Sequence, residues 1–269
     1  MKLETILLTD EGEGGAYLDA YLPDPTANFV RKPLLVIPGG GYGKVCADRE
    51  GEPIAQAFLP YGYSAFVLHY TVGRKKPFPA QLTEATLAIK YIKDHAKELG
   101  VDADELFVVG FSAGGHLAAS TGVLWKNEAV LEAIPMPHGY NKPTGVMLIY
   151  PVISPDYEHH IESFRNLWCS DTPTEEQLHA AAIERHVDAD SAPAFILHGV
   201  NDQTVDVRNS LTLANAYALA EVPFEMHIYP NAPHGLALAN AITAGGKPNW
   251  IVPAVAEWVR LAANWAETV

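Results

Sequence analysis

The chain has 269 residues, 48% of them hydrophobic and 19% charged, a composition typical of a soluble globular protein that buries a large core. The formal net charge of −14 at pH 7 argues against a nucleic-acid partner and against an anionic membrane surface, because both need a basic patch. Cys46 and Cys169 are too few for a disulfide framework, so we expect two ordinary thiols. We expect one domain over residues 1–269, since enzymes built on a single α/β sheet often reach this length.

Targeting and membrane signals are not found in the sequence. The N-terminal segment lacks the long apolar region and small-residue cleavage site of a signal peptide. No stretch approaches the length of a membrane-spanning helix. We therefore expect a cytoplasmic protein without a membrane partner, and the sequence leaves a homo-oligomer open.

The first elements in chain order form a predicted β-hairpin. Residues 3–9 and 16–22 are strand-like and are separated by a turn rich in Gly and Glu. Beyond this hairpin the pattern changes to short apolar runs without polar alternation, which are typical of parallel strands buried on both faces. These runs are residues 34–37, 65–68, 106–109, 146–149 and 194–197.

Helical patterns lie between the apolar runs. The clearest spans residues 80–99, where apolar residues recur at helical spacing until Gly100 ends the run. This alternation predicts a doubly wound, mostly parallel sheet of about eight strands with helices on both faces. The remaining predicted elements are a helix at residues 116–123, a helix at 207–220, a strand at 224–229, and a closing helix striped by Val255, Trp258, Ala262 and Trp265.

Residues 152–190 interrupt the alternation. They insert Phe164 and Trp168 and then a Glu/Gln/Ala-rich helical stretch between two predicted strands. The segment is too short for an independent domain, so we interpret it as a small inserted cap.

The strongest motif is Gly-Phe-Ser-Ala-Gly at residues 110–114, which matches G-x-S-x-G. It directly follows the predicted strand at 106–109 and precedes a predicted helix, the context that presents a serine oxygen on a sharp turn. A serine also serves often as a helix N-cap without any chemistry. Because the whole pentapeptide and its context agree, we predict that Ser112 is a nucleophile.

A serine nucleophile needs a neutral imidazole as base and a carboxylate that orients this imidazole. Asp202 follows the predicted strand at 194–197, and His234 lies in a turn-rich loop after the predicted strand at 224–229, in the chain order expected for this fold. Asp206 is the competing acid, but it begins a predicted helix, where a carboxylate has a structural role. We predict the triad Ser112, Asp202 and His234, and we assign His116 a hydrogen-bonding or packing role.

A glycine-rich loop follows the predicted strand at 34–37. Its sequence is Pro-Gly-Gly-Gly-Tyr at residues 38–42. Fixed backbone donors stabilise the oxyanion of ester hydrolysis by roughly 3 to 4 kcal/mol each. We predict an oxyanion hole made by the N–H groups of Gly40, Gly41 and Ala113. The loop meets neither the G-x-G-x-x-G nor the Walker pattern, so we expect no nucleotide cofactor.

We also expect no metal and no other cofactor. The one tempting cluster is His159 and His160 with Glu158 and Glu162. Adjacent residues point in different directions on a helix, and no second ligand set with a recognised spacing accompanies them.

These motifs together resemble the small carbohydrate acetylesterases and xylan-esterase-like members of the α/β hydrolases, relatives of the hormone-sensitive lipase group. The resemblance spans most of the chain and is carried by residues 38–42, 50–53, 110–118, 198–202 and 233–235. Pro38 stands where the hormone-sensitive lipase pattern has a histidine, which weakens the likeness to lipases but leaves backbone donors intact. The resemblance implies hydrolysis of short acyl esters, including acetyl groups on sugars, through an acyl-serine intermediate.

The predicted function is therefore that of a serine carboxylesterase acting on a small ester. Tyr42, Phe111, Phe164 and Trp168 are candidate substrate contacts, with ordinary core positions as the alternative. An amidase, formamidase or peptidase with the same triad is a second reading, because amide and ester hydrolysis share the tetrahedral intermediate. A ligand-binding protein on a hydrolase scaffold is the reading from a different class.

Overall fold

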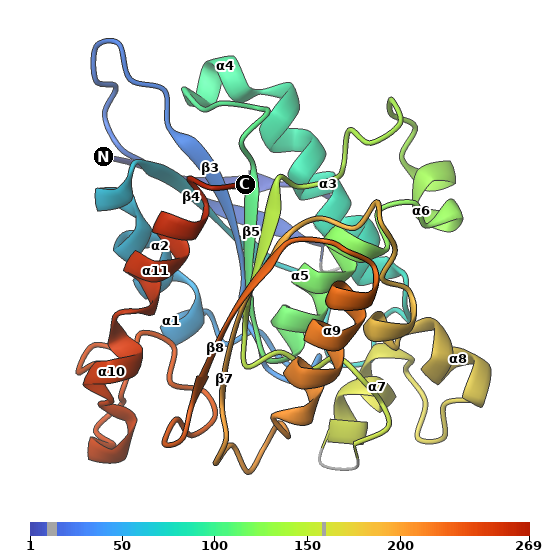
Figure 1. Cartoon of the computed structure of the whole chain (residues 1–269). Helices are drawn as coiled ribbons and strands as arrows, with labels where there is room; N and C mark the ends of the chain where they lie inside the picture. Colours follow the sequence, from blue (N-terminus) through green and yellow to red (C-terminus); the bar gives the residue numbers. More distant parts are fainter. Residues whose placement is uncertain (10–14, 158–159) are drawn as a thin grey trace.

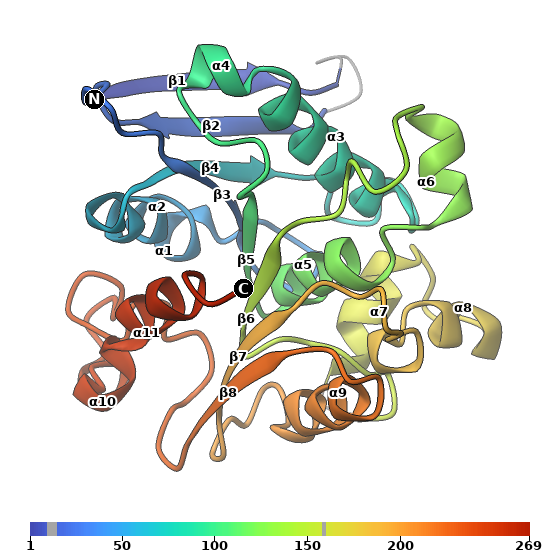
Figure 2. The same ribbon diagram turned by 45° about the horizontal axis from the view of Figure 1, so that its top comes forward.

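The computed structural model of the chain describes residues 1–9, 15–157 and 160–269. Its centre is an eight-stranded sheet in the order β1-β2-β4-β3-β5-β6-β7-β8 (Figures 1 and 2). From β4 to β8 all pairings are parallel, which confirms the predicted doubly wound sheet. The strands are β1 (Lys2–Leu7), β2 (Tyr17–Leu22), β3 (Lys32–Ile37), β4 (Tyr63–His69), β5 (Phe107–Phe111), β6 (Gly145–Ile149), β7 (Ala194–Gly199) and β8 (Phe224–Tyr229).

The predicted hairpin forms the first edge of the sheet. β1 and β2 pair antiparallel with Lys2 opposite Leu22 and Leu7 opposite Tyr17, and β2 pairs antiparallel with β4. The turn predicted between the two strands falls mostly on residues 10–14, which lie outside the described residues. Pairing over all six positions of β1 confirms the two strands themselves.

Helices cover both faces of the sheet (Figure 2). Leu35 and Ile37 point into a core shared with α3, α5 and α9, while Leu34 and Val36 point into a core shared with α2 and α11. This alternation is why the central strands are apolar at every position. The helices are α1 (Ala47–Glu50), α2 (Glu52–Phe58), α3 (Ala80–Asp94), α4 (Ala96–Leu99), α5 (Ala113–Val123), α6 (Glu128–Ala133), α7 (Ile161–Leu167), α8 (Glu175–Ala180), α9 (Arg208–Leu219), α10 (Pro253–Ala256) and α11 (Trp258–Trp265).

Two predicted helices are each divided in the structure. The helix predicted over 80–99 breaks at His95, whose ring Nδ1 lies 2.9 Å from the carbonyl oxygen of Tyr91, and the chain resumes as α4. The closing helix breaks at Glu257 between α10 and α11. In both cases the apolar spacing continues across the break, so periodicity alone could not reveal it.

Two segments extend beyond the carboxyl ends of the strands. The predicted cap region contains α7, α8 and a 3-10 turn at Ile183–Arg185, and it lies on the α5 and α9 side. Across the sheet, residues 235–252 form a long loop with a 3-10 turn at Pro248–Trp250 that leads into α10 (Figure 1). The sequence pattern had not indicated this second segment.

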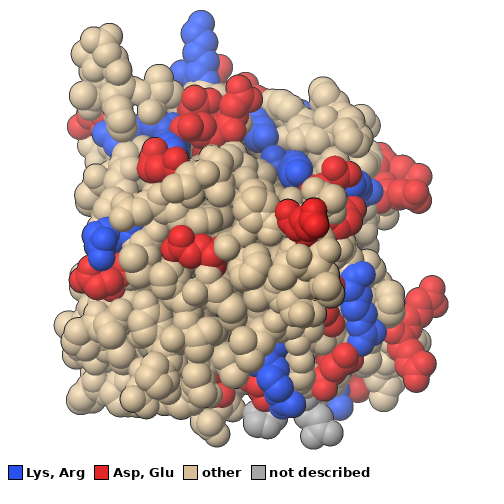
Figure 3. Space-filling model, viewed as in Figure 1, with Lys and Arg blue, Asp and Glu red and all other residues tan. Residues whose placement is uncertain are grey.

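Charged side chains are unevenly distributed on the face seen in Figure 3. They gather at the top and on the right, with Lys and Arg interspersed among Asp and Glu, whereas few occur at the lower left, over α10 and the ends of β7 and β8. Among the described residues, no helix combines the length and the apolar character needed to cross a membrane.

The packing of α11 against the sheet generates a stability prediction. Trp258 is fully buried, its ring packs against Phe58 and Phe111, and its Nε1–H donates to the carbonyl oxygen of Ala237 at 2.9 Å. We expect Trp258→Ala to lower the free energy of unfolding by about 3–5 kcal/mol, because it leaves a large cavity. Chemical denaturation measures this, and Leu219→Ala, at a side chain 79% exposed, should change stability little. Equal effects of the two substitutions would contradict the packing described.

Candidate active site

Ser112 occupies the turn between β5 and α5. Its backbone has φ 54° and ψ −121°, and its N–H donates to the carbonyl oxygen of Ile149 at 3.1 Å. The flanking glycines are required by space: a Cβ at Gly110 would lie 2.2 Å from the carbonyl oxygen of Gly114, and one at Gly114 would lie 2.3 Å from that of Ile37. The predicted strand, sharp turn and helix are all present. Ser112 is 9% exposed, so its hydroxyl lies just below the molecular surface.

His234 and Asp202 lie beside this serine. His234 Nε2 is 2.9 Å from Ser112 Oγ, and His234 Nδ1 is 2.7 Å from Asp202 Oδ2. A carboxylate accepts, so the Nδ1–H of the neutral ring donates to Asp202 and Nε2 is left as the acceptor for the serine proton. The three predicted side chains thus form one continuous hydrogen-bonded chain with the polarity that serine activation requires.

The electrostatics at Asp202 favour its charged form. Burial would raise the pKa of this carboxyl, but hydrogen bonds from His198 and His234 and from backbone N–H groups lower it well below its usual range. The other oxygen, Oδ1, accepts from the N–H groups of Thr204 and Val205, both at 2.8 Å. The competing carboxylate of Asp206 instead accepts the backbone N–H and the guanidinium of Arg208.

The loop of residues 38–42, called here the glycine loop, is held by all of its carbonyl groups. In a peptide unit the carbonyl and the next residue's N–H point in opposite directions, so holding the carbonyls of Gly39 and Gly40 fixes the N–H groups of Gly40 and Gly41. Gly40 and Gly41 have φ values of 129° and 63°, which favour glycine. The bonds are Tyr70 Oη–H to Pro38 O at 2.8 Å, Cys46 N–H to Gly39 O at 2.9 Å, Gly43 N–H to Gly40 O at 3.1 Å, Asn166 Nδ2–H to Gly41 O at 2.8 Å, and Gly73 N–H to Tyr42 O at 2.8 Å.

The three N–H groups predicted to bind an oxyanion are available for a ligand. Those of Gly40, Gly41 and Ala113 have no hydrogen-bond acceptor among the residues that the structure describes. Ala113 is also the first residue of α5, where helix N–H groups lack partners within the helix and attract negative charge. The geometry thus provides unsatisfied donors next to a serine oxygen. The sequence predicted which N–H groups these are, but it could not show how the loop is held.

Three of the four candidate substrate contacts lie in the core instead. Phe111 is fully buried against Trp258 and Tyr150, because its position in β5 points to the α11 side of the sheet. Phe164 is buried against the ring of His116. These predicted contacts are therefore corrected to packing roles, the alternative that the sequence left open.

Tyr42 is also buried and is bound to His116. The tyrosine oxygen lies 2.7 Å from His116 Nδ1, and His116 Nε2 lies 2.8 Å from the carbonyl oxygen of Ala181. Because a carbonyl only accepts, Nε2 carries the proton and the tyrosine O–H donates to Nδ1. This chain ties the glycine loop to the segment after α8 and agrees with the hydrogen-bonding role assigned to His116. Trp168, the remaining candidate, is half-buried with its ring against Phe78.

A buried carboxylate for which the sequence indicated no role, Glu50, lies behind the serine. Glu50 is 1% exposed; its Oε2 accepts the N–H of Gly39 at 2.8 Å and its Oε1 accepts the hydroxyl of Tyr150 at 3.0 Å. The Tyr150 oxygen in turn accepts the N–H of Ala237 at 2.9 Å. Burial raises the pKa of Glu50. The available signal was a glutamate in the 50–53 segment, which the family resemblance had singled out without a role.

No group of three or more His, Cys, Asp or Glu side chains suited to a metal occurs within residues 1–9, 15–157 and 160–269. Of the cluster considered from the sequence, Glu158 and His159 lie outside the described residues. His160 lies near the triad, with its ring centroid 6.3 Å from that of His234, and Glu162 pairs with Arg74 at 2.9 Å.

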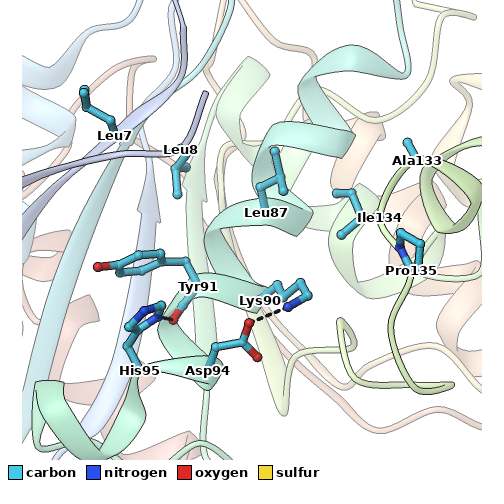
Figure 4. Close-up of a pocket in the computed structure, with 10 residues that line it drawn as sticks. All are labelled: Leu7, Leu8, Leu87, Lys90, Tyr91, Asp94, His95, Ala133, Ile134 and Pro135. Carbon is cyan, nitrogen blue, oxygen red and sulfur yellow. Dashed lines mark hydrogen bonds and ion pairs between the residues drawn. The ribbon is translucent and has the colours of Figure 1, made fainter. Parts of the chain in front are cut away.

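A separate hollow of about 330 Å³ lies between the end of β1, α3 and the segment after α6 (Figure 4). Its titratable groups are engaged locally, since Lys90 pairs with Asp94 and His95 bonds the Tyr91 carbonyl. The remaining lining is mainly aliphatic, so this hollow offers no nucleophile with an adjacent base. The lining residues are Leu7, Leu8, Leu87, Lys90, Tyr91, Asp94, His95, Ala133, Ile134 and Pro135.

The chain is similar in sequence to known proteins. The sequence model of the BD-FAE family matches residues 18–217. Endo-1,4-beta-xylanase B from Butyrivibrio fibrisolvens is 36% identical over 211 residues, which cover 77% of this chain and 33% of that protein. For this relative and three further curated relatives, the chain spans between 33% and 57% of the relative's length.

Solved structures resemble the whole chain. The acetyl ester-xyloside bifunctional hydrolase from Caldicellulosiruptor lactoaceticus superposes with a TM-score of 0.82 at 31% identity, covering 98% of this chain and 96% of that one. The carboxylesterase Cest-2923 from Lactobacillus plantarum superposes with a TM-score of 0.84 at 26% identity, covering 100% and 98%.

The buried His116 generates a prediction about acid stability. Burial lowers its pKa to about 4, below the value near 6.5 of an unfolded histidine. The unfolded chain therefore binds the proton more readily, and stability falls as the pH drops from about 6.5 to about 4, by roughly 3 kcal/mol from this group. His116→Gln, whose amide accepts from Tyr42 and donates to Ala181 without titrating, should lose less stability over this range.

Urea unfolding of both proteins at pH 7, 5.5 and 4 measures the difference. His138→Gln, at an exposed histidine, is the control and should show the same dependence of the unfolding free energy on pH as the wild type. If the unfolding free energy of His116→Gln depended on pH as in the wild type, His116 would not be held neutral by burial.

Proposed function

This chain belongs to the BD-FAE family and is an α/β hydrolase of the esterase group, and we propose that it hydrolyses short acyl esters, acetyl esters of carbohydrates in particular. The observation that carries the proposal is the hydrogen-bonded chain from Ser112 Oγ through His234 to Asp202 beside available backbone donors. Such a constellation activates a serine and stabilises the anion that its attack creates.

In the proposed mechanism Ser112 Oγ attacks the ester carbonyl carbon while His234 Nε2 takes the serine proton. The carbonyl oxygen becomes an oxyanion, which the N–H groups of Gly40, Gly41 and Ala113 bind. The intermediate collapses, the carbon–oxygen bond to the alcohol breaks, and His234 gives its proton to the departing alcohol. Water then attacks the acyl-serine by the same steps, which releases the acid and restores Ser112.

Both relatives and geometry support a small acyl group. One similar solved structure is named an acetyl ester-xyloside bifunctional hydrolase, and the relative from Butyrivibrio fibrisolvens is named a xylanase. An acetyl ester of a sugar is the substrate class that fits both names. We propose that residues 152–190 form a cap next to the serine. Asn166 of α7 donates to the carbonyl of Gly41, so this segment lies directly against the glycine loop. We propose that it restricts the acyl group to a short chain.

Acyl-chain preference and dependence on Ser112 form the first test. We expect the wild type to hydrolyse p-nitrophenyl acetate faster than the butyrate and far faster than the octanoate. Ser112→Ala should lower kcat by a factor on the order of 10⁶. Ser120→Ala is the matched control, since that buried hydroxyl only donates to the carbonyl of His116 within α5 and should leave hydrolysis intact.

Equal rates in the wild type and Ser112→Ala, or no turnover of any ester, would reject the proposal. Faster cleavage of an acetyl amide than of the matched ester would point to an amidase, and tight ligand binding without turnover to a binding protein.

The rate should also depend on pH. Because His234 must be neutral to take the serine proton, kcat/KM should fall in acid as the imidazole becomes protonated. Asp202, whose pKa is held well below its usual range, stays charged as this happens. A rate that stays flat down to pH 4 would be incompatible with His234 as the base.

A further inference from the structure

Three segments of the active site meet at the carboxylate of Glu50. It receives the N–H of Gly39 at 2.8 Å from the glycine loop and the hydroxyl of Tyr150 at 3.0 Å from the residue after β6. Through the Tyr150 oxygen it is joined to the N–H of Ala237, in the loop that carries His234. The ring of Tyr150 also lies edge-on to that of His234, with centroids 4.9 Å apart.

The carboxylate is packed directly behind the nucleophile. A Cβ at Gly39 would lie 2.9 Å from Glu50 Oε2 and also 2.9 Å from the Cβ of Ser112, so only a glycine fits between them. Glu50 is 1% exposed and cannot touch a substrate that arrives from solvent. Its influence on the reaction must therefore pass through the groups that it holds.

We propose that Glu50 is a positioning residue of the esterase reaction, which fixes the glycine loop against the His234 loop and adds a negative charge that stabilises the protonated His234. The inference rests on the proposed function. Its geometric part follows from peptide orientation, because the bond to the Gly39 N–H sets the start of the loop whose next two N–H groups face the substrate. Misplacement of such groups by about 1 Å can cost a hundredfold in rate.

The charge of Glu50 acts on a crowded set of ionisable groups. Arg49 of α1 lies with its Nε 3.8 Å from Glu50 Oε1, the oxygen that also accepts from Tyr150, and the charge of His234 acts on the same carboxylate. Cys46 and Tyr70, which also support the glycine loop, each have their pKa raised by burial and by the nearby charge of Glu50. Removal of that charge should make His234 harder to protonate, so the acid limb of the pH profile moves to lower pH.

Two substitutions separate the charge from the geometry. Glu50→Gln keeps the length, so its oxygen can accept from Gly39 and its amide can donate to Tyr150, but the charge is lost. We expect kcat to fall about tenfold and the acid limb of kcat to move down by roughly half a pH unit. Glu50→Asp keeps the charge but is one methylene too short to reach both partners. Here we expect a larger loss of kcat, on the order of a hundredfold, with the acid limb where it is in the wild type.

Glu84→Gln is the matched control. Glu84 is another buried carboxylate with a pKa raised by burial, and its partner is Thr71, whose N–H it accepts at 2.7 Å, not a residue of the triad or the glycine loop. It should reproduce any general cost of neutralising a buried carboxylate but leave the acid limb unmoved. Thermal unfolding of each protein shows whether the rates refer to folded enzyme.

Tyr150→Phe keeps the inference testable if both Glu50 variants fail to fold. This change leaves the Gly39 N–H bound to Glu50 but removes two hydrogen bonds, the one from the Tyr150 hydroxyl to Glu50 and the one from the Ala237 N–H to Tyr150. We expect a fivefold to tenfold loss of kcat, less than the hundredfold that a 1 Å misplacement can cost, with little change in KM. Wild-type kcat and acid limb in Glu50→Gln, or wild-type kcat in Tyr150→Phe, would overturn the inference. Because the wild type is assayed alongside Ser112→Ala, failure of the esterase assignment itself is seen separately, as an absence of serine-dependent turnover.

Discussion

Backbone packed against backbone at the turn between β5 and α5 is the constraint on which the rest of the site depends. Gly110 and Gly114 each leave less than 2.5 Å between a would-be Cβ and a carbonyl oxygen, so the helix can start directly at the end of the strand. That start places Ser112 at a positive φ, with its hydroxyl held above the sheet. The central strands, buried on both faces by two layers of helices, supply the rigidity that maintains this strained residue.

The same close approach connects the nucleophile to the glycine loop. A Cβ at Gly114 would strike the carbonyls of both Ile37 and Pro38, so the end of β3 runs directly beside the first turn of α5. Ala113 and the glycine loop therefore present their N–H groups to one small region from two elements. The N–H groups of Cys46 and Gly43, which bind the carbonyls of Gly39 and Gly40, then fix the direction of the Gly40 and Gly41 N–H groups. Donors fixed in this way need no reorganisation when charge develops.

The features that could be predicted from the sequence are those encoded locally. Apolar runs and turn glycines located the strands, and G-x-S-x-G with its strand and helix located the sharp turn at Ser112, the proposed nucleophile, because each depends on neighbouring residues alone. Partners brought together across the fold were not accessible in this way. Phe111 was considered for substrate contact because it adjoins Ser112, yet strand alternation turns its side chain toward Trp258. Glu50 could be noticed only as a residue of the 50–53 segment, because its hydrogen-bond partners Gly39 and Tyr150 lie 11 and 100 residues away along the chain.

Two buried carboxylates near the same histidine show how the number of donors decides the charge state. Asp202 accepts from two backbone N–H groups and from the ring of His234, and His198 Nε2 lies 3.4 Å from its Oδ2. These contacts outweigh its burial, so its pKa is lowered. Glu50 accepts one N–H and one hydroxyl, both neutral, with Arg49 at 3.8 Å, and burial prevails, so its pKa is raised. Asp202 therefore stays charged below the usual pKa range of an aspartate and can still accept from His234 there. The ionisation of Glu50, in contrast, depends on the very loops that it joins, so a change in their packing alters the charge that the triad experiences.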